Sequence, residues 1–307
     1  MRQIAAILSI VFCLAALTAH AAHTQVKLLL SADAAKPGDT IWAGVDLKME
    51  PGWHTYWKNP GDAGMATQIK WQLPPGISAG QIQWPLPEKF PPAEVTTYGY
   101  SNEVMLLVPL TIETNIPPGQ IDLKANVSWL ECKEVCIPAN QDVEAKLNIG
   151  SETKSSADAA AIKSWKSKTP ETDSSFQFCA WWEKPPDGDT RPLIIAMYFF
   201  PERKFVFFKA PDFYPDANDQ FEIQAATEEI PDRNFVFSLR KNVKKYSGDW
   251  PKEISGVISG VFLLDINGEK TGLNVKLPIA DKPPTGGTIS STENLPPQSP
   301  WKMLLYA

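Results

Sequence analysis

The chain has little of what several protein classes require. Only four of its 307 residues are cysteine and three are histidine, so metal ligands are scarce. The net charge is −6 and no basic block occurs, which argues against a nucleic acid or another anionic partner. Hydrophobic residues make up 43% and charged residues 21%, a composition that excludes a disordered chain. What remains is a globular protein long enough for about two domains.

The N-terminal segment indicates export. Arg2 precedes an apolar run over residues 4–17, and the small-residue pattern Ala19-His20-Ala21 follows it. This is the pattern of a cleavable signal peptide, and the run is too short to span a bilayer comfortably. We therefore expect a signal peptide over residues 1–22. Cys13 would be removed with it, which leaves an odd number of cysteines in a compartment where disulfides form.

The first half of the mature chain has the pattern of short β-strands. Many of its apolar runs alternate with polar residues, and glycine, proline or asparagine clusters separate them. This spacing predicts an immunoglobulin-like antiparallel β-sandwich over residues 23–150. The expected strands lie in residues 26–32, 40–49, 66–73, 77–84, 103–112, 121–131 and 141–149.

A polar stretch rich in Ser, Ala and Lys follows over residues 151–175 and is typical of a linker that holds one short helix. A second strand-rich block over residues 176–280 predicts a second β-sandwich, with a hairpin turn at Asn267-Gly268. The tail, residues 281–307, is expected to be flexible, and its last apolar residues are too few to cross a membrane. The predicted fold class is therefore all-β, with two immunoglobulin-like antiparallel β-sandwich domains joined by a polar linker.

The stretch SWLECKEVCIP places Cys132 and Cys136 four positions apart, and three interpretations are open. A metal site needs about four ligands, usually Cys or His, and His54 is the only histidine well inside the mature chain. A structural disulfide is plausible in an exported protein, yet closing so short a loop contributes only about 2 kcal/mol.

A redox pair is the third interpretation. A short loop strains its disulfide, and a strained, exposed disulfide is more easily reduced. Lys133 favours a thiolate, whereas Glu131 and Glu134 oppose one. The residues alone favour the redox pair over the structural disulfide and leave both open.

Three stretches, in this order, together resemble one known family. They are PGWHTYWKNPGDAG (51–64), TTYGYSNEVMLLVPLTI (96–112) and VSWLECKEVCIPANQDVEAKL (127–147). They resemble the periplasmic N-terminal domain of the DsbD/ScsB family of thiol:disulfide interchange proteins, over about residues 25–150. The second block is similar to the extended periplasmic region of the ScsB-like branch. The final LPPQSPWKMLLYA looks like the place where the family's membrane domain begins.

The resemblance implies an immunoglobulin-like domain whose cysteine pair exchanges disulfides. Cys132 and Cys136 would be that pair, with Cys136 attacking the downstream partner and Cys132 resolving the mixed disulfide. Tyr56 matches an aromatic residue that the family places over the sulfurs, and its alternative is a core aromatic. His54 in the same stretch is either a local base or an ordinary surface residue. The three intervening residues, fewer than in the best-known members, match the ScsB-like branch better.

The family also shields its disulfide with a cap loop before a Tyr-Gly pair. Tyr98-Gly99 is present here, but residues 95–97 differ from the acidic and aromatic groups of that loop. We expect Tyr98 or Tyr100 to shield the pair with Glu94 nearby, or the pair to be less protected. Cys179, in FQFCAWWE, is expected to be a buried thiol that packs as a small hydrophobe.

The resulting functional hypothesis is a periplasmic thiol:disulfide oxidoreductase that needs no metal or organic cofactor. The resemblance implies that it receives electrons from a membrane-embedded thiol reductant and passes them to thioredoxin-like or other oxidised periplasmic proteins. The chain to Ala307 lacks that membrane domain, so the reductant would be a continuation of the chain or a separate partner. The alternative is a periplasmic binding or adaptor module whose disulfide is only structural.

Overall fold

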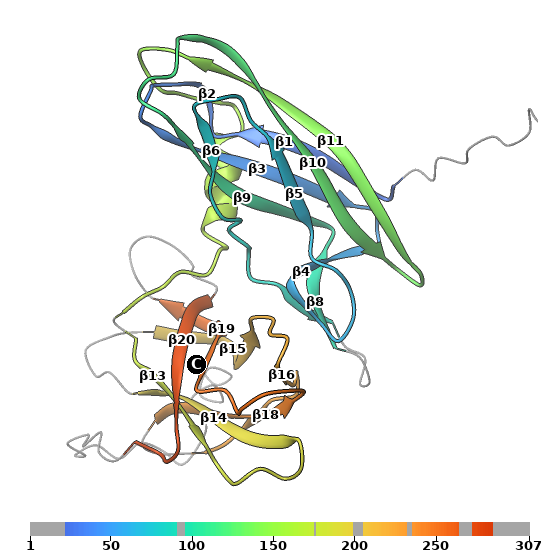
Figure 1. The fold of residues 1–307 in the computed structure, drawn as a ribbon, viewed down its shortest axis with the longest axis vertical. Helices are drawn as coiled ribbons and strands as arrows, with labels where there is room; N and C mark the ends of the chain where they lie inside the picture. The colour runs from blue at the N-terminus through green and yellow to red at the C-terminus, as the bar shows by residue number, and fades with distance from the viewer. Residues whose placement is uncertain are drawn as a thin grey trace, which may run out of the picture.

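The structure is a computed structural model that describes residues 22–90, 96–174, 176–198, 205–231, 235–263 and 272–284. Residues 1–21 of the signal peptide predicted over 1–22, Glu94, the turn at Asn267-Gly268 and the tail from residue 285 lie outside these ranges. Within them, no helix is both long enough and apolar enough to cross a membrane. The described chain is almost entirely β-structure, arranged as two bodies joined by one short segment (Figure 1).

Two sheets form the first sandwich, and several of its strands follow the expected alternation. One sheet has the strand order β1 (Thr24–Leu30), β3 (Thr40–Met49), β9 (Glu103–Ile112) and β6 (Ile77–Ala79). The other has the order β12 (Lys154–Ser155), β2 (Ala32–Ala35), β11 (Cys136–Ile149), β10 (Gly119–Cys132), β4 (His54–Gly61), β8 (Thr97–Ser101) and β7 (Glu88–Phe90), and β5 (Gln68–Gln72) also pairs with β10.

The inward faces of these sheets make the first core. Val45 and Leu47 from β3, Leu106 from β9, and Val127 and Trp129 from β10 are at most 1% exposed. Successive strand residues point to opposite faces, so the alternate residues of these strands lie toward the other sheet. Along β10 their neighbours lie on the outer face, whereas Met105 and Leu107 on the outer face of β9 are also buried. Burying this apolar surface is the main force that holds the two sheets together.

The second sandwich contains the strands of residues 178–280. Their order is β15 (Phe205–Pro215), β19 (Glu253–Leu263), β20 (Gly272–Ala280), β13 (Phe178–Trp182), β14 (Thr190–Tyr198), β18 (Phe235–Lys245) and β16 (Phe221–Ile223), and β17 (Glu228–Glu229) also pairs with β18. The predicted fold class is therefore confirmed. The pairs β13–β20 and β2–β11 are parallel, an exception to the expected antiparallel pairing.

The polar segment between the sandwiches is attached to the first one. It contains β12 and a short helix, α2 (Ala159–Lys166). Ile162 of this helix is 2% exposed and packs with Met105 and Leu107 of β9, while the Lys166 ammonium lies 4.1 Å from the centre of the Trp42 ring. The segment thus combines the expected helix with apolar contacts that a freely extended linker would lack.

Candidate redox site

The long hairpin of β10 and β11 carries the cysteine pair at its turn (Figure 1). The register places Cys132, the last residue of β10, directly opposite Cys136, the first residue of β11. A disulfide joins them, with the two Cα atoms 4.2 Å apart. The turn residues 133–135 close the hairpin through a backbone bond from the Lys133 amide to the Val135 carbonyl. The strand pairing therefore brings the sulfurs together before any partner is present.

The two sulfurs differ in exposure because the two strands have different neighbours. Cys132 is 3% exposed, since β10 is flanked by β4 at this point and His54 pairs with Cys132. Cys136 is exposed. The outer neighbour of β11 is β2, which pairs only with Asn148 and Ile149 at the far end of the strand. Cys136 is therefore the more accessible residue of the pair, and Cys132 is covered.

Tyr56 on β4 lies against both sulfurs. Its hydroxyl donates a hydrogen bond to Cys132 Sγ at 2.9 Å and lies 3.5 Å from Cys136 Sγ. The tyrosine is 3% exposed, and burial raises its pKa above the usual value. The hydroxyl therefore keeps its proton at neutral pH and can donate it in a hydrogen bond to a thiolate.

Gly64 fixes the position of the Tyr56 ring. The glycine backbone has φ of +119°, and a Cβ atom placed on it would lie 2.3 Å from Cδ1 of Tyr56. Only a residue without a side chain permits the chain to pass so close to the ring. Gly64 is thus part of the wall that holds the phenol against the sulfurs.

His54 lies on β4, the strand of Tyr56, and pairs with Cys132. Its ring packs edge-on against Tyr56 with centroids 5.4 Å apart, and against Phe90 with centroids 5.1 Å apart. Burial lowers the pKa of His54, so the imidazole is neutral at pH 7. A neutral ring adds no positive charge next to the sulfurs and acts here by packing.

Glu131 is a buried carboxylate next to Cys132 that the sequence interpretation treated only as a charge opposing a thiolate. It is fully buried and accepts hydrogen bonds from Trp129 Nε1 at 3.0 Å and from the backbone amide of His23 at 2.8 Å. A signal was present in the sequence, because alternation along VSWLEC places Glu131 on the inward face with Val127 and Trp129. The carboxylate connects the segment before β1 to the end of β10.

Comparison with known proteins identifies the family of the domain that carries this site. Residues 25–148 match the family model described as "Thiol:disulfide interchange protein DsbD, N-terminal". The matched range contains both cysteines, Tyr56 and His54. The first sandwich is a DsbD/ScsB-like N-terminal domain. The recognised family and the disulfide together make this DsbD-like domain a thiol:disulfide interchange module.

One solved structure shows the same fold over most of the chain. The N-terminal periplasmic domain of ScsB from Proteus mirabilis is 19% identical, with a TM-score of 0.57, and the match covers 85% of this chain and 96% of that one. The reduced DsbD N-terminal domain from Neisseria meningitidis is 17% identical, with a TM-score of 0.24, and the match covers 43% of this chain and 90% of that one. No curated protein sequence matches.

Two tyrosines expected to shield the pair lie elsewhere in the DsbD-like domain. Tyr98 is 2% exposed and packs against Trp57 and against Tyr214 of the second sandwich, with ring centroids 6.1 and 5.0 Å apart. Tyr100 donates its hydroxyl to the Pro85 carbonyl at 2.7 Å. The pairing of β8 with β4 brings Gly99 opposite Tyr56, so alternation turns the two tyrosines away from that position.

Cys179 is far from the DsbD-like site in sequence, and it is more exposed than the buried thiol that the sequence predicted. It lies on β13 of the second sandwich, half-buried and not fully buried, and takes no part in the disulfide. Its Sγ lies 3.8 Å from the Ala196 carbonyl on the neighbouring strand, β14. Strand pairing alone accounts for its position.

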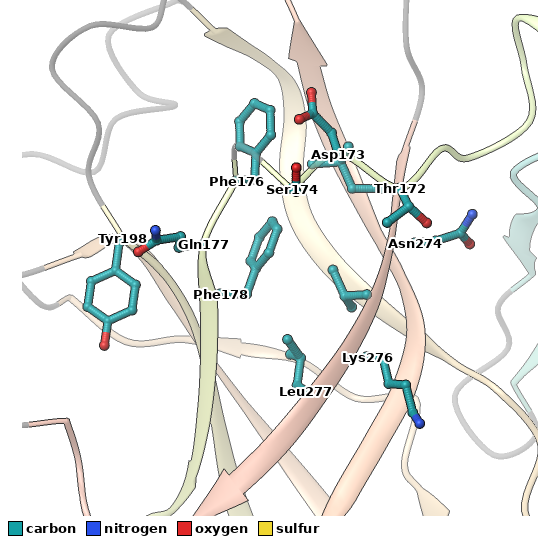
Figure 2. A pocket seen from close by; sticks show the side chains of 12 residues that line it. Thr172, Asp173, Ser174, Phe176, Gln177, Phe178, Tyr198, Asn274, Lys276 and Leu277 are labelled. Atoms are coloured by element: carbon teal, nitrogen blue, oxygen red, sulfur yellow. The ribbon is translucent and has the colours of Figure 1, made fainter.

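The second sandwich also has a pocket of about 400 Å³. Phe176, Phe178 and Leu277 are among its apolar lining residues, and Asp173 and Lys276 are among its polar ones (Figure 2). Neither redox cysteine nor Tyr56 lines it. The pocket is therefore separate from the DsbD-like redox site.

Proposed function

We propose that this protein is a periplasmic thiol:disulfide oxidoreductase that relays two electrons through Cys132 and Cys136. Membership of the first sandwich in the DsbD N-terminal family supports this function. The observation that carries it is the unequal environment of the two sulfurs. Cys136 is exposed, whereas Cys132 is buried and accepts a hydrogen bond from Tyr56. The sulfur of Cys136 is open to attack, and the sulfur of Cys132 is the leaving group that the Tyr56 hydrogen bond stabilises.

The reductive half of the cycle follows from this geometry. A thiolate of the reduced partner attacks Cys136 Sγ, a mixed disulfide forms, and the Cys132–Cys136 bond breaks. The electron pair of that bond stays on Cys132, and the Tyr56 hydroxyl stabilises the new thiolate with a charge-assisted hydrogen bond. The partner's second thiol then displaces Cys136. The partner leaves oxidised, and the pair is left reduced.

The oxidative half passes the electrons on. The exposed Cys136 thiolate attacks a disulfide of the client protein, and one client sulfur leaves as a thiolate. Cys132 then attacks Cys136 in the mixed disulfide, which releases the reduced client and restores the Cys132–Cys136 bond. Cysteine chemistry alone balances both halves, so the cycle needs no metal or organic cofactor.

The family supports a partner on each side of this cycle. We propose that electrons enter from a membrane-embedded thiol reductant and leave to thioredoxin-like or other oxidised periplasmic proteins. We also propose the domain division expected from the sequence, with the redox domain over residues 23–150, the linker over 151–175 and the second domain over 176–280. Export through a signal peptide over residues 1–22 would place these domains in the periplasm.

A redox titration tests the proposed function. The mature chain is equilibrated with glutathione or dithiothreitol buffers, alkylated, and analysed by mass spectrometry for each cysteine separately. We expect Cys132 and Cys136 to titrate together at a potential between about −120 and −270 mV, the range of known exchange proteins. Cys179 serves as the internal control, because its alkylation should not follow the buffer potential.

One result would overturn the proposal. If the Cys132–Cys136 bond stays oxidised below about −300 mV, as structural disulfides do, the pair is a structural link. The protein would then be a binding or adaptor module, and the pocket at Phe176 and Phe178 would be the first place to search for its ligand.

A further inference from the structure

A buried polar cluster lies in the second sandwich, on the side that meets the first. Its centre is the Asp212 carboxylate on β15, which accepts hydrogen bonds from the Lys241 ammonium at 3.2 Å and from the Thr227 hydroxyl at 2.5 Å. Lys241 is fully buried and also donates to the Ala225 carbonyl at 3.0 Å. Buried charges of this kind require complete hydrogen bonding to be tolerated.

The first sandwich supplies one member of this cluster. Lys89 on β7 reaches across, and its ammonium donates to Asp212 Oδ2 at 2.8 Å and to the Ala225 carbonyl at 2.6 Å. Burial alone would raise the pKa of Asp212, but the charges of Lys241 and Lys89 outweigh it and hold that pKa below its usual value. Lys89 is therefore a half-buried member of this ion cluster and not a fully solvated surface charge.

Strands β8 and β4, which follow β7 in the sheet, also contact the second sandwich. Tyr98 on β8 packs its ring against Tyr214, which belongs to the same buried cluster as the core of the first sandwich. Asn59 on β4 donates its side-chain amide to the Pro215 carbonyl at 2.8 Å. Strands β4 and β8 lie at the end of the first sandwich that faces the second one (Figure 1). The partners of Lys89, Tyr98 and Asn59 at Asp212, Tyr214 and Pro215 lie within residues 212–215, and Lys89 also contacts Ala225.

One of these strands, β4, lies beside the disulfide. Phe90 follows Lys89 directly and packs against His54, and His54 is the strand partner of Cys132. Tyr56, which contacts both sulfurs, lies on β4 between His54 and the anchored Asn59. A short path thus runs from Asp212 to Cys132 through the Lys89 ion pair, the adjacent Phe90, the Phe90–His54 ring contact and the strand pairing of His54 with Cys132.

We propose that Lys89 is a positioning residue through which the second sandwich holds Phe90 and His54 over the buried sulfur of the redox pair. The second sandwich then influences disulfide exchange directly, because it keeps Cys132 covered and restricts attack to Cys136. This inference rests on the proposed function for its biological meaning. Its physical content, protection of Cys132 by the anchor at Asp212, is tested separately.

The experiment compares Lys89→Met with Lys146→Met in the full mature chain. Methionine keeps the length of the lysine and removes the charge. Lys146 pairs with Asp122 at 3.1 Å on the exposed surface of the β10–β11 hairpin, so its variant controls for the loss of a lysine ion pair. Lys89→Arg serves as the conservative variant, since a guanidinium retains the charge and can donate to Asp212 and Ala225.

Three quantities are measured on the oxidised proteins. They are amide hydrogen exchange of residues 86–90, the rate of disulfide reduction by dithiothreitol, and the fraction of the glutathione mixed disulfide found on Cys132. For Lys89→Met we expect faster exchange, reduction about fivefold faster, and mixed disulfide on Cys132 as well as Cys136, because local opening exposes the buried sulfur. Lys146→Met should match the wild type, and Lys89→Arg should restore most of the protection.

Two results would overturn the inference. One is faster exchange at residues 86–90 with an unchanged reduction rate and attack still confined to Cys136, which would make the anchor purely structural. The other is unchanged exchange, which would mean that Lys89 does not hold β7. A wild-type potential outside the range of exchange proteins would overturn only the proposed function, because the ratio of the variant rates still decides whether Lys89 protects Cys132.

Discussion

The Tyr56 hydroxyl lies 2.9 Å from the sulfur of Cys132, the less exposed of the two cysteines. A buried sulfur lacks water to stabilise its negative charge, so this one donor replaces part of the missing solvation. The contact connects β4, the strand anchored to the second sandwich by Asn59, with the last residue of β10. Strand pairing, burial and a single hydrogen bond together therefore determine the environment of the Cys132 sulfur.

Tyr56→Phe removes the hydroxyl and keeps the ring. A hydrogen bond to a charged group contributes about 1.5 kcal/mol or more, so the pKa of the Cys132 thiol should rise by about one unit. The check is the pH dependence of Cys132 alkylation in the reduced protein, read by mass spectrometry. An unchanged Cys132 pKa would mean that the phenol acts only by packing.

Gly64→Ala should displace the Tyr56 ring, because the new Cβ would lie 2.3 Å from Cδ1 of that ring. We expect a loss of about 1–3 kcal/mol in the free energy of unfolding together with part of the Tyr56→Phe change in the Cys132 pKa. Gly188→Ala is the matched control, since Gly188 also has positive φ, at +60°, but nothing lies within 4 Å of its Cβ position. If both variants changed the Cys132 pKa equally, the displacement argument would be wrong.

Single serine substitutions should separate the two cysteines. In Cys132→Ser the exposed Cys136 remains and should react with a disulfide reagent at least about tenfold faster than Cys132 does in Cys136→Ser, because burial limits access and raises thiol pKa values. Stopped-flow measurement with an aromatic disulfide reports both rates. The variant with both serines corrects for Cys179. Equal rates would contradict the assignment of Cys136 as the attacked sulfur.

The sequence predicted many of the alternating strands and singled out the two cysteines that form the disulfide. β3 and the β10–β11 hairpin follow apolar alternation, whereas β9 is an apolar run buried on both faces. Three stretches, one of them around Cys132 and Cys136, identified the family. The exposure difference was not predictable, because it depends on β4 crossing beside Cys132 while β2 pairs only with the far end of β11. Such neighbours are separated by many residues along the chain, and spacing carries no information about them.

The contact of Lys89 with Asp212 of the second sandwich was equally unpredictable from the sequence. Lys89 stands in PLPEKFPP, where a lysine between prolines reads as a solvated charge. Its partner Asp212 lies 123 positions away, and no local pattern connects the two. Tyr98 was assigned to the disulfide by its Tyr-Gly motif, but the register of β8 turns it toward Tyr214. Interactions between sheets set these positions, and sequence periodicity describes only one strand at a time.

Asp46 on β3 should make the protein less stable as the pH rises. Burial raises its pKa from 3.8 to about 6, with the charge of Glu103 adding to the effect, and Asp46 Oδ1 has no hydrogen-bond partner among the described residues. The folded state then binds more protons than the unfolded state between pH 3.8 and about 6, so the free energy of unfolding falls as pH rises through this window.

Asp46→Asn removes the charge and should therefore stabilise the protein at pH 7. The gain should be about 1 kcal/mol, because partial exposure screens the interaction, and it should be smaller at pH 4, where the native carboxyl is already protonated. Urea unfolding at both pH values measures it, with Asp122→Asn on the exposed hairpin surface as the control. A variant no more stable than the wild type at pH 7 would mean that the charges of Lys27 and Lys48 already offset the burial of Asp46.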